Sequence, residues 1–304
     1  MMLKHLLATP FPHFTKTVHV VLMLLAALSS HVYANVITDE NLIPGTANWE
    51  LANPAESREI EGYASRTSVN RGESIDLFVN TSAATYRVDV FRMGWYQGLG
   101  ARAVFSSGNI PGIIQQISQP DSHGMVNNDW INPVTLVTAH TSGQPWVSGV
   151  YLAKLTESVA NKQSYIIFVV RDDAREADIA FQLPVTTYQA YNFWGGKSSY
   201  DWGSGGIEPW GATSGNAASK LSFNRPYAGS TNPVVAYGIG AGEFLANVQP
   251  VAQGYPISSA GWDYNMVRWL EKEGYDVSYI TNIDTHQSPE LLHNFKVFLS
   301  VGHD

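Results

Sequence analysis

The hydrophobic period changes partway along the chain, and this change constrains the fold more than any other feature. Before about Asp178, apolar and polar residues alternate in short runs, which Gly- and Asn-containing turns separate. After it, apolar runs alternate with segments of helical period. A period of two is typical of strands with one buried face, whereas alternating strands and helices indicate a parallel sheet. The sequence therefore predicts an all-β unit followed by an α/β unit.

The first unit, residues 35–177, is predicted to be an antiparallel β-sandwich of immunoglobulin-like type. Strands are expected at Ser74–Val79, Tyr86–Phe91, Val134–Thr138, Gly149–Leu155 and Ser164–Arg171. The last of these is almost continuously apolar, as expected of a strand buried on both faces. Short strands at this spacing, without a convincing helical period, favour a sandwich. Its default role is packing or binding, since no chemistry is evident in its sequence.

The second unit, residues 178–304, is predicted to hold a parallel sheet. Its first segment is Asp178–Val185, and further strands are expected at Asn232–Ile239, Tyr275–Ile280 and, as a buried strand, Lys296–Val301. Ser258 or Ser259 is expected to cap a helix whose apolar face is Trp262, Met266, Trp269 and Leu270, and Ser288 a shorter one. A doubly wound sheet normally has more elements than these. We therefore expect the chain to be a fragment, or truncated inside this unit.

Residues 1–34 have the layout of a signal peptide. Lys4 and Lys16 are their only charged residues, Val18–Leu28 is apolar, and Val32-Tyr33-Ala34 is a small-x-small-like end. An apolar run this short does not span the roughly 30 Å of hydrocarbon in a bilayer. We expect cleavage near Ala34 and a mature protein that is secreted or periplasmic in a bacterium, with no membrane attachment after cleavage.

The composition excludes several classes of function. The net charge is −8 and only 14% of residues are charged, so nothing here would neutralise the phosphates of a nucleic acid. The chain has no cysteine, which excludes disulfides, thiolate metal sites and cysteine nucleophiles. Its 9 Trp and 15 Tyr leave open a non-catalytic protein that binds carbohydrate by ring stacking. Ordinary core and interdomain packing is the simpler interpretation of these aromatic residues.

Three sets of residues invite a chemical interpretation. The run 238–242 (G-I-G-A-G) follows a predicted strand, but Glu243 stands where the dinucleotide fingerprint requires glycine, so no nucleotide site is expected. Asp284 and His286 follow one predicted strand, and His303 and Asp304 follow the next, at the same rim of the sheet. Carboxylate and imidazole groups there would suit a metal or acid–base catalysis. For Asp284 and His286 we favour the simpler interpretation, that they cap helices.

Several motifs resemble one known family. The segments Y-Q-A-Y-N-F-W-G-G-K-S-S-Y (188–200), S-F-N-R-P-Y (222–227), W-L-E-K-E-G-Y-D-V-S-Y (269–279) and L-S-V-G-H-D (299–304) are similar to the large (β) subunit of N,N-dimethylformamidase and its relatives. R-M-G-W-Y (92–96) resembles the immunoglobulin-like domain that precedes the catalytic domain in that family. The resemblance covers roughly residues 60–304. It implies an immunoglobulin-like sandwich followed by a flavodoxin-like core similar to class I glutamine amidotransferases, here incomplete.

The resemblance also implies a chemistry. The characterised enzyme hydrolyses an amide C–N bond with one iron held by two tyrosines and a glutamate, which here implies Tyr188 (less so Tyr191) and Tyr227. The glutamate would come from G-H-D-E-Y-W, immediately after Asp304, and is absent, so we expect this chain to be inactive. His303 would act beside the metal or as a general acid–base group. The expected substrate is a small amide, and a small partner subunit or a homo-oligomer is left open.

Overall fold

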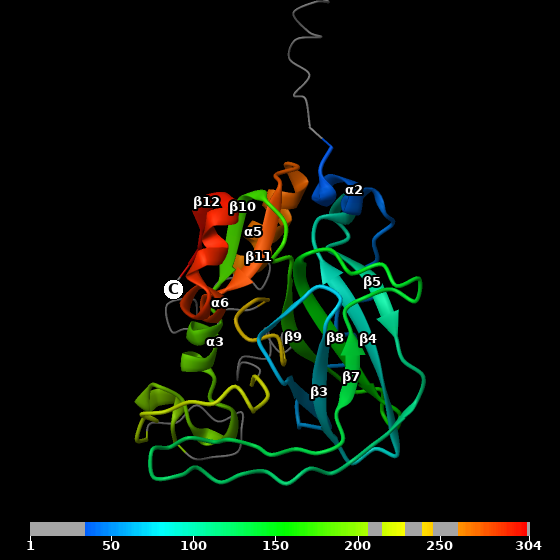
Figure 1. Cartoon of the computed structure of the whole chain (residues 1–304). Helices are drawn as coiled ribbons and strands as arrows, with labels where there is room; N and C mark the ends of the chain where they lie inside the picture. Colours follow the sequence, from blue (N-terminus) through cyan, green and yellow to red (C-terminus); the bar gives the residue numbers. More distant parts are fainter. Residues whose placement is uncertain (1–33, 206–214, 229–238, 246–260, 303–304) are drawn as a thin grey trace, which may run out of the picture. The chain divides into compact units, whose positions relative to one another are not determined.

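The computed structural model describes residues 34–205, 215–228, 239–245 and 261–302, which combine several β-sheets with few helices (Figure 1). This mixed content agrees with the prediction of β structure followed by α/β structure. Two of the sheets are formed by residues 60–171, and the third begins with the strand that follows them.

The largest sheet has six strands. Five of them lie in the order β2-β9-β8-β4-β5, and β6 also pairs with β4. The pairs are antiparallel except β2 with β9, which is parallel. The strands are β2 Ser68–Asn70, β4 Thr85–Met93, β5 Ala101–Ser106, β6 Ile110–Pro111, β8 Gly149–Glu157 and β9 Gln163–Arg171.

A second, antiparallel sheet shares a core with the first. It has the order β1-β3-β7, with β1 Ile60–Ala64, β3 Ser74–Thr81 and β7 Val134–Val137. Leu77 and Val79 of β3 and Val88 and Val90 of β4 belong to one buried cluster. Alternation along β3 places every second side chain inside, which is the pattern that its sequence predicted.

The five strands expected from the sequence all occur, within a few residues of their expected ends. Four others, β1, β2, β5 and β6, were missed because they are short or alternate poorly. A short helix, α2 (Val36–Leu42), was also missed. Its start is a capping box, in which the Asn35 side chain accepts hydrogen bonds from the backbone of Ile37 and Thr38.

The third sheet is parallel, as predicted, and has the order β11-β10-β12. Its central strand β10 comes first in the sequence and pairs with both others. The strands are β10 Ala177–Leu183, β11 Val277–Thr281 and β12 Phe295–Leu299, and the helices around them are α3 Val185–Tyr191, α5 Trp262–Lys272, α6 Asn282–Gln287 and the 3-10 turn η6 Pro289–Asn294. Further 3-10 turns are η1 Tyr96–Gly98, η2 Trp194–Gly196 and η3 Asp201–Gly203.

Two expectations for this part were wrong. The buried face of α5 is formed by Asp263, Val267, Leu270 and Glu271, whereas Trp262 and Trp269 are 39% and 47% exposed. Two acidic residues lie inside because each has a buried hydrogen-bond partner, Tyr188 for Asp263 and Arg92 for Glu271. Strand β12 is not buried but lies at the edge of the sheet, with Val297 and Phe298 about half exposed.

Other expectations for this part concern residues outside those described. The predicted strand Asn232–Ile239 falls there except for Ile239, as do the proposed cap residues Ser258 and Ser259. Helix α5 itself begins at Trp262, with Gly261 as N-cap residue and no side-chain cap. No helix among the described residues is long and apolar enough to cross a membrane.

A largely buried set of charged and polar side chains joins β4 to α5 and α2. We call it the Arg92 cluster (Arg92, Tyr96, Glu271, Glu40 and Arg102). The Arg92 guanidinium donates to both carboxylate oxygens of Glu271, at 2.8 and 3.1 Å, and to the Tyr96 hydroxyl at 2.9 Å. That hydroxyl donates to Glu40 at 2.7 Å, which also accepts from Arg102 at 2.6 Å. Arg92 and Tyr96 belong to the R-M-G-W-Y motif, which is therefore a structural motif in this protein.

Candidate functional site

Tyr188 lies at the carboxyl end of the central strand β10. The chain leaves this strand at Leu183, passes Pro184 and enters helix α3, whose inner face carries Tyr188. The tyrosine is only 2% exposed, and its hydroxyl donates a 2.6 Å hydrogen bond to the Asp263 carboxylate in the first turn of α5. Ligands bind at this end of the strands in open α/β sheets.

Tyr227 approaches Tyr188 from a different segment of the chain. The two rings lie edge to face with their centroids 6.4 Å apart. We call Tyr188, Tyr227 and Asp263 the tyrosine site. The loop of Tyr227 is held on both sides by Asn192, which donates to the Pro226 carbonyl at 2.9 Å and accepts from the Ala228 amide at 3.0 Å.

The surroundings act differently on the two phenols. Burial raises the pKa of Tyr188 well above its ordinary value, and the nearby Asp263 and Glu243 carboxylates raise it further. Burial also raises the pKa of Tyr227, but the neighbouring Arg225 guanidinium opposes this shift. Both phenols are therefore protonated at neutral pH in the absence of a cation.

Arg225 is a buried cation that organises this region. It is 1% exposed, and its five hydrogen bonds end on neutral oxygens: the side chain and carbonyl of Gln189 and the carbonyls of Asn192, Trp194 and Lys197. Burial lowers the pKa of Arg225 to about 10. By tying down the carbonyls that follow α3, Arg225 fixes the segment that carries Asn192, and Asn192 in turn fixes Tyr227.

The glycine-rich run 238–242 serves close packing where the structure describes it. A side chain at Gly242, which has φ +59°, would lie 2.9 Å from the Tyr188 ring. One at Gly240, with φ +85°, would lie 2.0 Å from the carbonyl oxygen of Tyr165. Contacts this short exclude any side chain, and they explain these glycines without a nucleotide.

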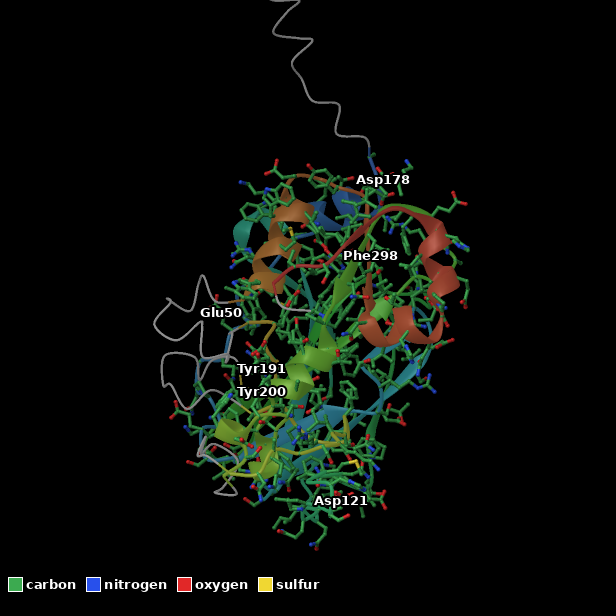
Figure 2. All side chains as sticks on the ribbon, turned by 90° about the vertical axis from the view of Figure 1, so that its left-hand side faces the viewer. Glu50, Asp121, Asp178, Tyr191, Tyr200 and Phe298 are labelled. Carbon is green, nitrogen blue, oxygen red and sulfur yellow. The ribbon has the colours of Figure 1, made fainter. Side chains whose placement is uncertain are left out.

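The other candidate residues lie elsewhere. Tyr191 stacks on Tyr200 with ring centroids 4.5 Å apart, and the two lie together in Figure 2. Asp284 caps α6 by accepting a hydrogen bond from the Thr281 backbone, as the helix-capping interpretation predicted. It also forms an ion pair with Arg171 at 2.8 Å. His286 is exposed. His303 and Asp304 lie outside the described residues.

The donors at the tyrosine site fit a hard cation. No group of three or more His, Asp or Glu side chains that could hold a metal occurs among the described residues. Tyr188, Tyr227 and Asp263 instead offer phenol and carboxylate oxygens, which suit ferric iron better than soft metals. Sequence reasoning missed Asp263, Asn192 and Arg225. Asn192 and Arg225 lie inside the family motifs, and Asp263 lies in helix α5. Only the fold brings them to Tyr188 and Tyr227.

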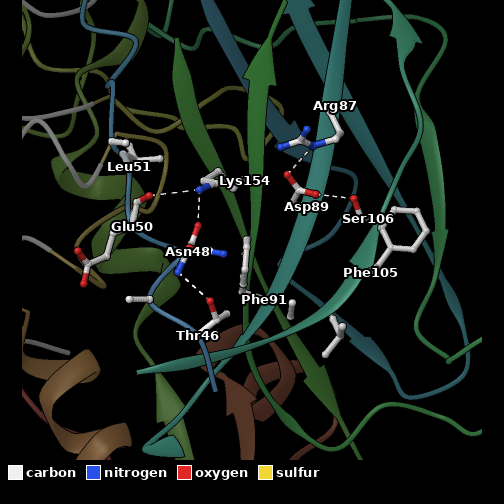
Figure 3. Close-up of a pocket in the computed structure, with 14 residues that line it drawn as sticks. Thr46, Asn48, Glu50, Leu51, Arg87, Asp89, Phe91, Phe105, Ser106 and Lys154 are labelled. Carbon is white, nitrogen blue, oxygen red and sulfur yellow. Dashed lines mark hydrogen bonds and ion pairs between the residues drawn. The ribbon is translucent and has the colours of Figure 1, made fainter. Parts of the chain in front are cut away.

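A large groove lies elsewhere, on the outer face of the six-stranded sheet (Figure 3). It has a volume of about 820 Å³ and is lined by residues 46–48 and 50–52 and by β4, β5 and β8. Its polar groups bond mainly to one another: Asp89 accepts from Arg87 at 2.8 Å and from Ser106 at 2.6 Å, and Lys154 donates to the carbonyls of Asn48 and Glu50. The aromatic residues that line it are Phe91, which is buried, and Phe105, which is 36% exposed.

Comparison with known proteins agrees with the motifs that meet at this site. No curated protein matches the chain. The family model described as N,N-dimethylformamidase beta subunit-like, C-terminal, matches residues 87–304. This range covers most of the chain, from β4 through the tyrosine site to the last residue. The chain therefore belongs to the N,N-dimethylformamidase beta subunit-like family.

Proposed function

We propose that this protein is a secreted relative of N,N-dimethylformamidase, a family whose activity is iron-dependent hydrolysis of an amide C–N bond, and that Tyr188 and Tyr227 are its iron ligands. The inactivity expected from the missing glutamate ligand stays a prediction. The observation that carries the proposal is the meeting of these tyrosines, which lie far apart in the sequence, beside the Asp263 carboxylate. Iron bound there would act as a Lewis acid and would activate water at neutral pH.

The protein's own side chains would prepare this step. Asp263 orients the Tyr188 hydroxyl, because a charge-assisted hydrogen bond of 2.6 Å fixes the direction of the oxygen. Asn192 and Arg225 hold the loop of Tyr227. We assign His303 to proton transfer, on the ground that it follows β12 at the carboxyl end of the parallel sheet.

The proposal extends to architecture and surroundings. The two sheets that share a core are proposed to form an immunoglobulin-like sandwich, and the sheet β11-β10-β12 to be part of an amidotransferase-like domain. The family is described as beta subunit-like, which supports a partner subunit. Residues 1–34 are proposed to direct export, on the signal-like pattern of their sequence.

The test is the iron content and visible spectrum of the purified protein and of three variants. Tyr188→Phe and Tyr227→Phe should each lose most of the iron and the absorption band of the bound phenolate. Tyr191→Phe is the matched control, because it removes a buried hydroxyl from the same helix but outside the tyrosine site, and it should keep both. Equal iron content in all four proteins would overturn the assignment of these ligands.

A further inference from the structure

The groove of Figure 3 crosses strands β8, β4 and β5 on the outer face of the six-stranded sheet. Val88 and Val90 of β4 face the core, so Asp89 between them faces outward. Asp89 pairs in register with Lys154 of β8 on one side and with Ser106 of β5 on the other. These three residues form a row across the sheet, and all of them line the groove. Neighbouring strands lie about 5 Å apart, so the row spans about 10 Å.

The side chains along this row keep hydrogen-bonding capacity for a ligand. Lys154 is buried, and its ammonium donates to the carbonyls of Asn48 and Glu50, which leaves one of its three N–H groups without an acceptor among the described residues. Arg87 donates to Asp89 through Nε only, so its two terminal nitrogens have no acceptor in the described part of the chain. Each carboxylate oxygen of Asp89 accepts one hydrogen bond and can accept a second. Free donors and acceptors therefore lie side by side.

The charges that line the groove cancel. They are two cations, Arg87 and Lys154, and two anions, Asp89 and Glu50. The chain as a whole has a net charge of −8, which repels anions. A cationic ligand would in turn meet the two cations of the groove. This balance favours a ligand that is polar but uncharged.

An apolar surface adjoins the polar row. Phe105 of β5 is the exposed one of the groove's two aromatic residues, and Figure 3 shows it beside Ser106. The C–H groups on one face of a sugar ring pack well on an aromatic ring, while the hydroxyls at its edge both donate and accept. The volume of about 820 Å³ lies within the range of small-ligand pockets and has room for more than one sugar ring.

We propose that this groove binds a neutral oligosaccharide, with one ring stacked on Phe105 and its hydroxyls bonded to Arg87 and Asp89. Adjacent hydroxyls of a sugar can accept from the guanidinium and donate to the carboxylate at the same time. Lys154 donates to a hydroxyl or ring oxygen further along the chain of sugars. Strands β4, β5 and β8 contribute no residue to the tyrosine site, so this binding does not depend on the proposed amide hydrolysis.

A peptide that adds to the sheet is the main alternative occupant. Strand β5 is the last in the strand order, and peptides can extend a sheet at such an edge. The edge is already engaged at its start, where the Thr46 amide donates to the carbonyl of Ala101 at 2.8 Å. The row through Asp89 lies on the face of the sheet, where side chains rather than backbone groups meet the ligand. A sugar is therefore the better fit.

A glycan array followed by calorimetry tests the proposal. The array carries neutral chains, such as cellopentaose, chitopentaose and maltopentaose, and acidic chains, such as trigalacturonic acid. The purified protein should bind neutral chains in preference to acidic ones, whether or not it has been stripped of metal. In calorimetry with the neutral chain that binds best, Arg87→Met should weaken binding roughly 10- to 100-fold, because it removes a charged donor. Phe105→Ala should weaken it roughly 3- to 10-fold, because it removes the stacking ring.

The matched control is Trp269→Ala, which removes a half-exposed aromatic ring from α5, outside the groove, and should bind like the unaltered protein. Phe105→Leu keeps an apolar side chain but no ring, so it should weaken binding even if Phe105→Ala disturbs the fold. Binding that is lost in Trp269→Ala but kept in both Phe105 variants would overturn the proposal by moving the stacking site to α5. A preference for acidic chains, or no binding to any neutral glycan, would also overturn it.

Discussion

The Arg92 cluster and the tyrosine site are both buried and polar, but they differ in how charge is distributed. In the Arg92 cluster, Arg92 and Arg102 face Glu271 and Glu40, so cations and anions balance. In the tyrosine site, the Tyr188 hydroxyl donates to the Asp263 carboxylate, and the Glu243 carboxylate also raises its pKa. The nearby cation Arg225 directs its hydrogen bonds to neutral oxygens. Burial of polar groups does not by itself mark a functional site.

On the proposed function, the difference separates a structural role from a chemical one. A balanced cluster gains nothing from a further ion, because its cations already face its anions. Two phenols beside carboxylates can exchange their protons for a metal cation, because the added positive charge would offset the charge of those carboxylates. Four predictions test this contrast.

The largest effect is expected in the Arg92 cluster. Arg92→Met leaves Glu271 and Glu40 buried without their main cation and should lower the free energy of unfolding by about 3–5 kcal/mol. Urea unfolding followed by tryptophan fluorescence measures it. The double variant Arg92→Met/Glu271→Met should regain part of the loss, and Lys272→Met, an exposed change on the same helix, should have a far smaller effect. A loss no larger than that of Lys272→Met would remove the basis of the comparison.

The Arg92 cluster should also make stability depend on acid pH. Burial alone would raise the pKa of Glu40, but Arg92 and Arg102 and the Tyr96 hydroxyl hold it below its usual value. The stability that Glu40 contributes is therefore present above about pH 4.5 and is lost as the pH falls through the lowered folded-state value. In Glu40→Gln, the loss of unfolding free energy between pH 5 and pH 3 should be smaller than in the unaltered protein by about 1–3 kcal/mol. Equal slopes in both proteins would contradict this.

At the tyrosine site the expected change is in metal affinity. Asp263→Asn keeps the size of the side chain but replaces a charged acceptor for the Tyr188 hydroxyl with a neutral one. Iron affinity, measured by titration into metal-free protein, should fall roughly 10- to 100-fold. Glu273→Gln removes an exposed carboxylate just beyond the same helix and should bind iron like the unaltered protein. If both variants bind iron alike, Asp263 does not orient Tyr188.

The smallest effect is expected at an exposed ion pair. Lys296 and Asp178 are 2.6 Å apart, with side chains 79% and 54% exposed. Solvent screens such pairs, so their net contribution is small. Lys296→Ala should leave the thermal unfolding midpoint unchanged. A shift comparable to that of Arg92→Met would mean that the number of ion pairs, rather than their burial, sets stability here.

The sequence predicted the elements of this fold better than the faces they present. Alternation identified β3, β4, β7, β8 and β9, because a half-buried strand needs little beyond local pattern. The same reasoning was right for Leu270 and Met266 of α5 but wrong for Trp262 and Trp269, which are exposed. Its tryptophans look like core residues, and nothing local reveals that Asp263 and Glu271 have partners at Tyr188 and Arg92.

The candidate site divides in the same way. Tyr188 and Tyr227 came from motif resemblance, and the structure brings their rings together. In the sequence, Asp263 is an acidic residue in the first turn of a predicted helix. The helix dipole favours acidic residues there, so nothing in the sequence pointed to a role in the site. Arg225 lies inside a family motif, but its role was not evident from the sequence. The path of the chain from α3 onward determines its five hydrogen-bond acceptors, and the sequence does not reveal that path.

The order of the parallel sheet has a consequence for how the protein is made. Strand β10 is central, yet its partners β11 and β12 begin only at Val277 and Phe295. On a ribosome that adds about 5–20 residues per second, β10 waits roughly 5–20 s before its first partner is synthesised. During that time an apolar strand with two open edges must be shielded by chaperones or by the already folded sheets. The cellular yield of this protein should therefore be sensitive to translation rate and chaperone supply between residues 177 and 299.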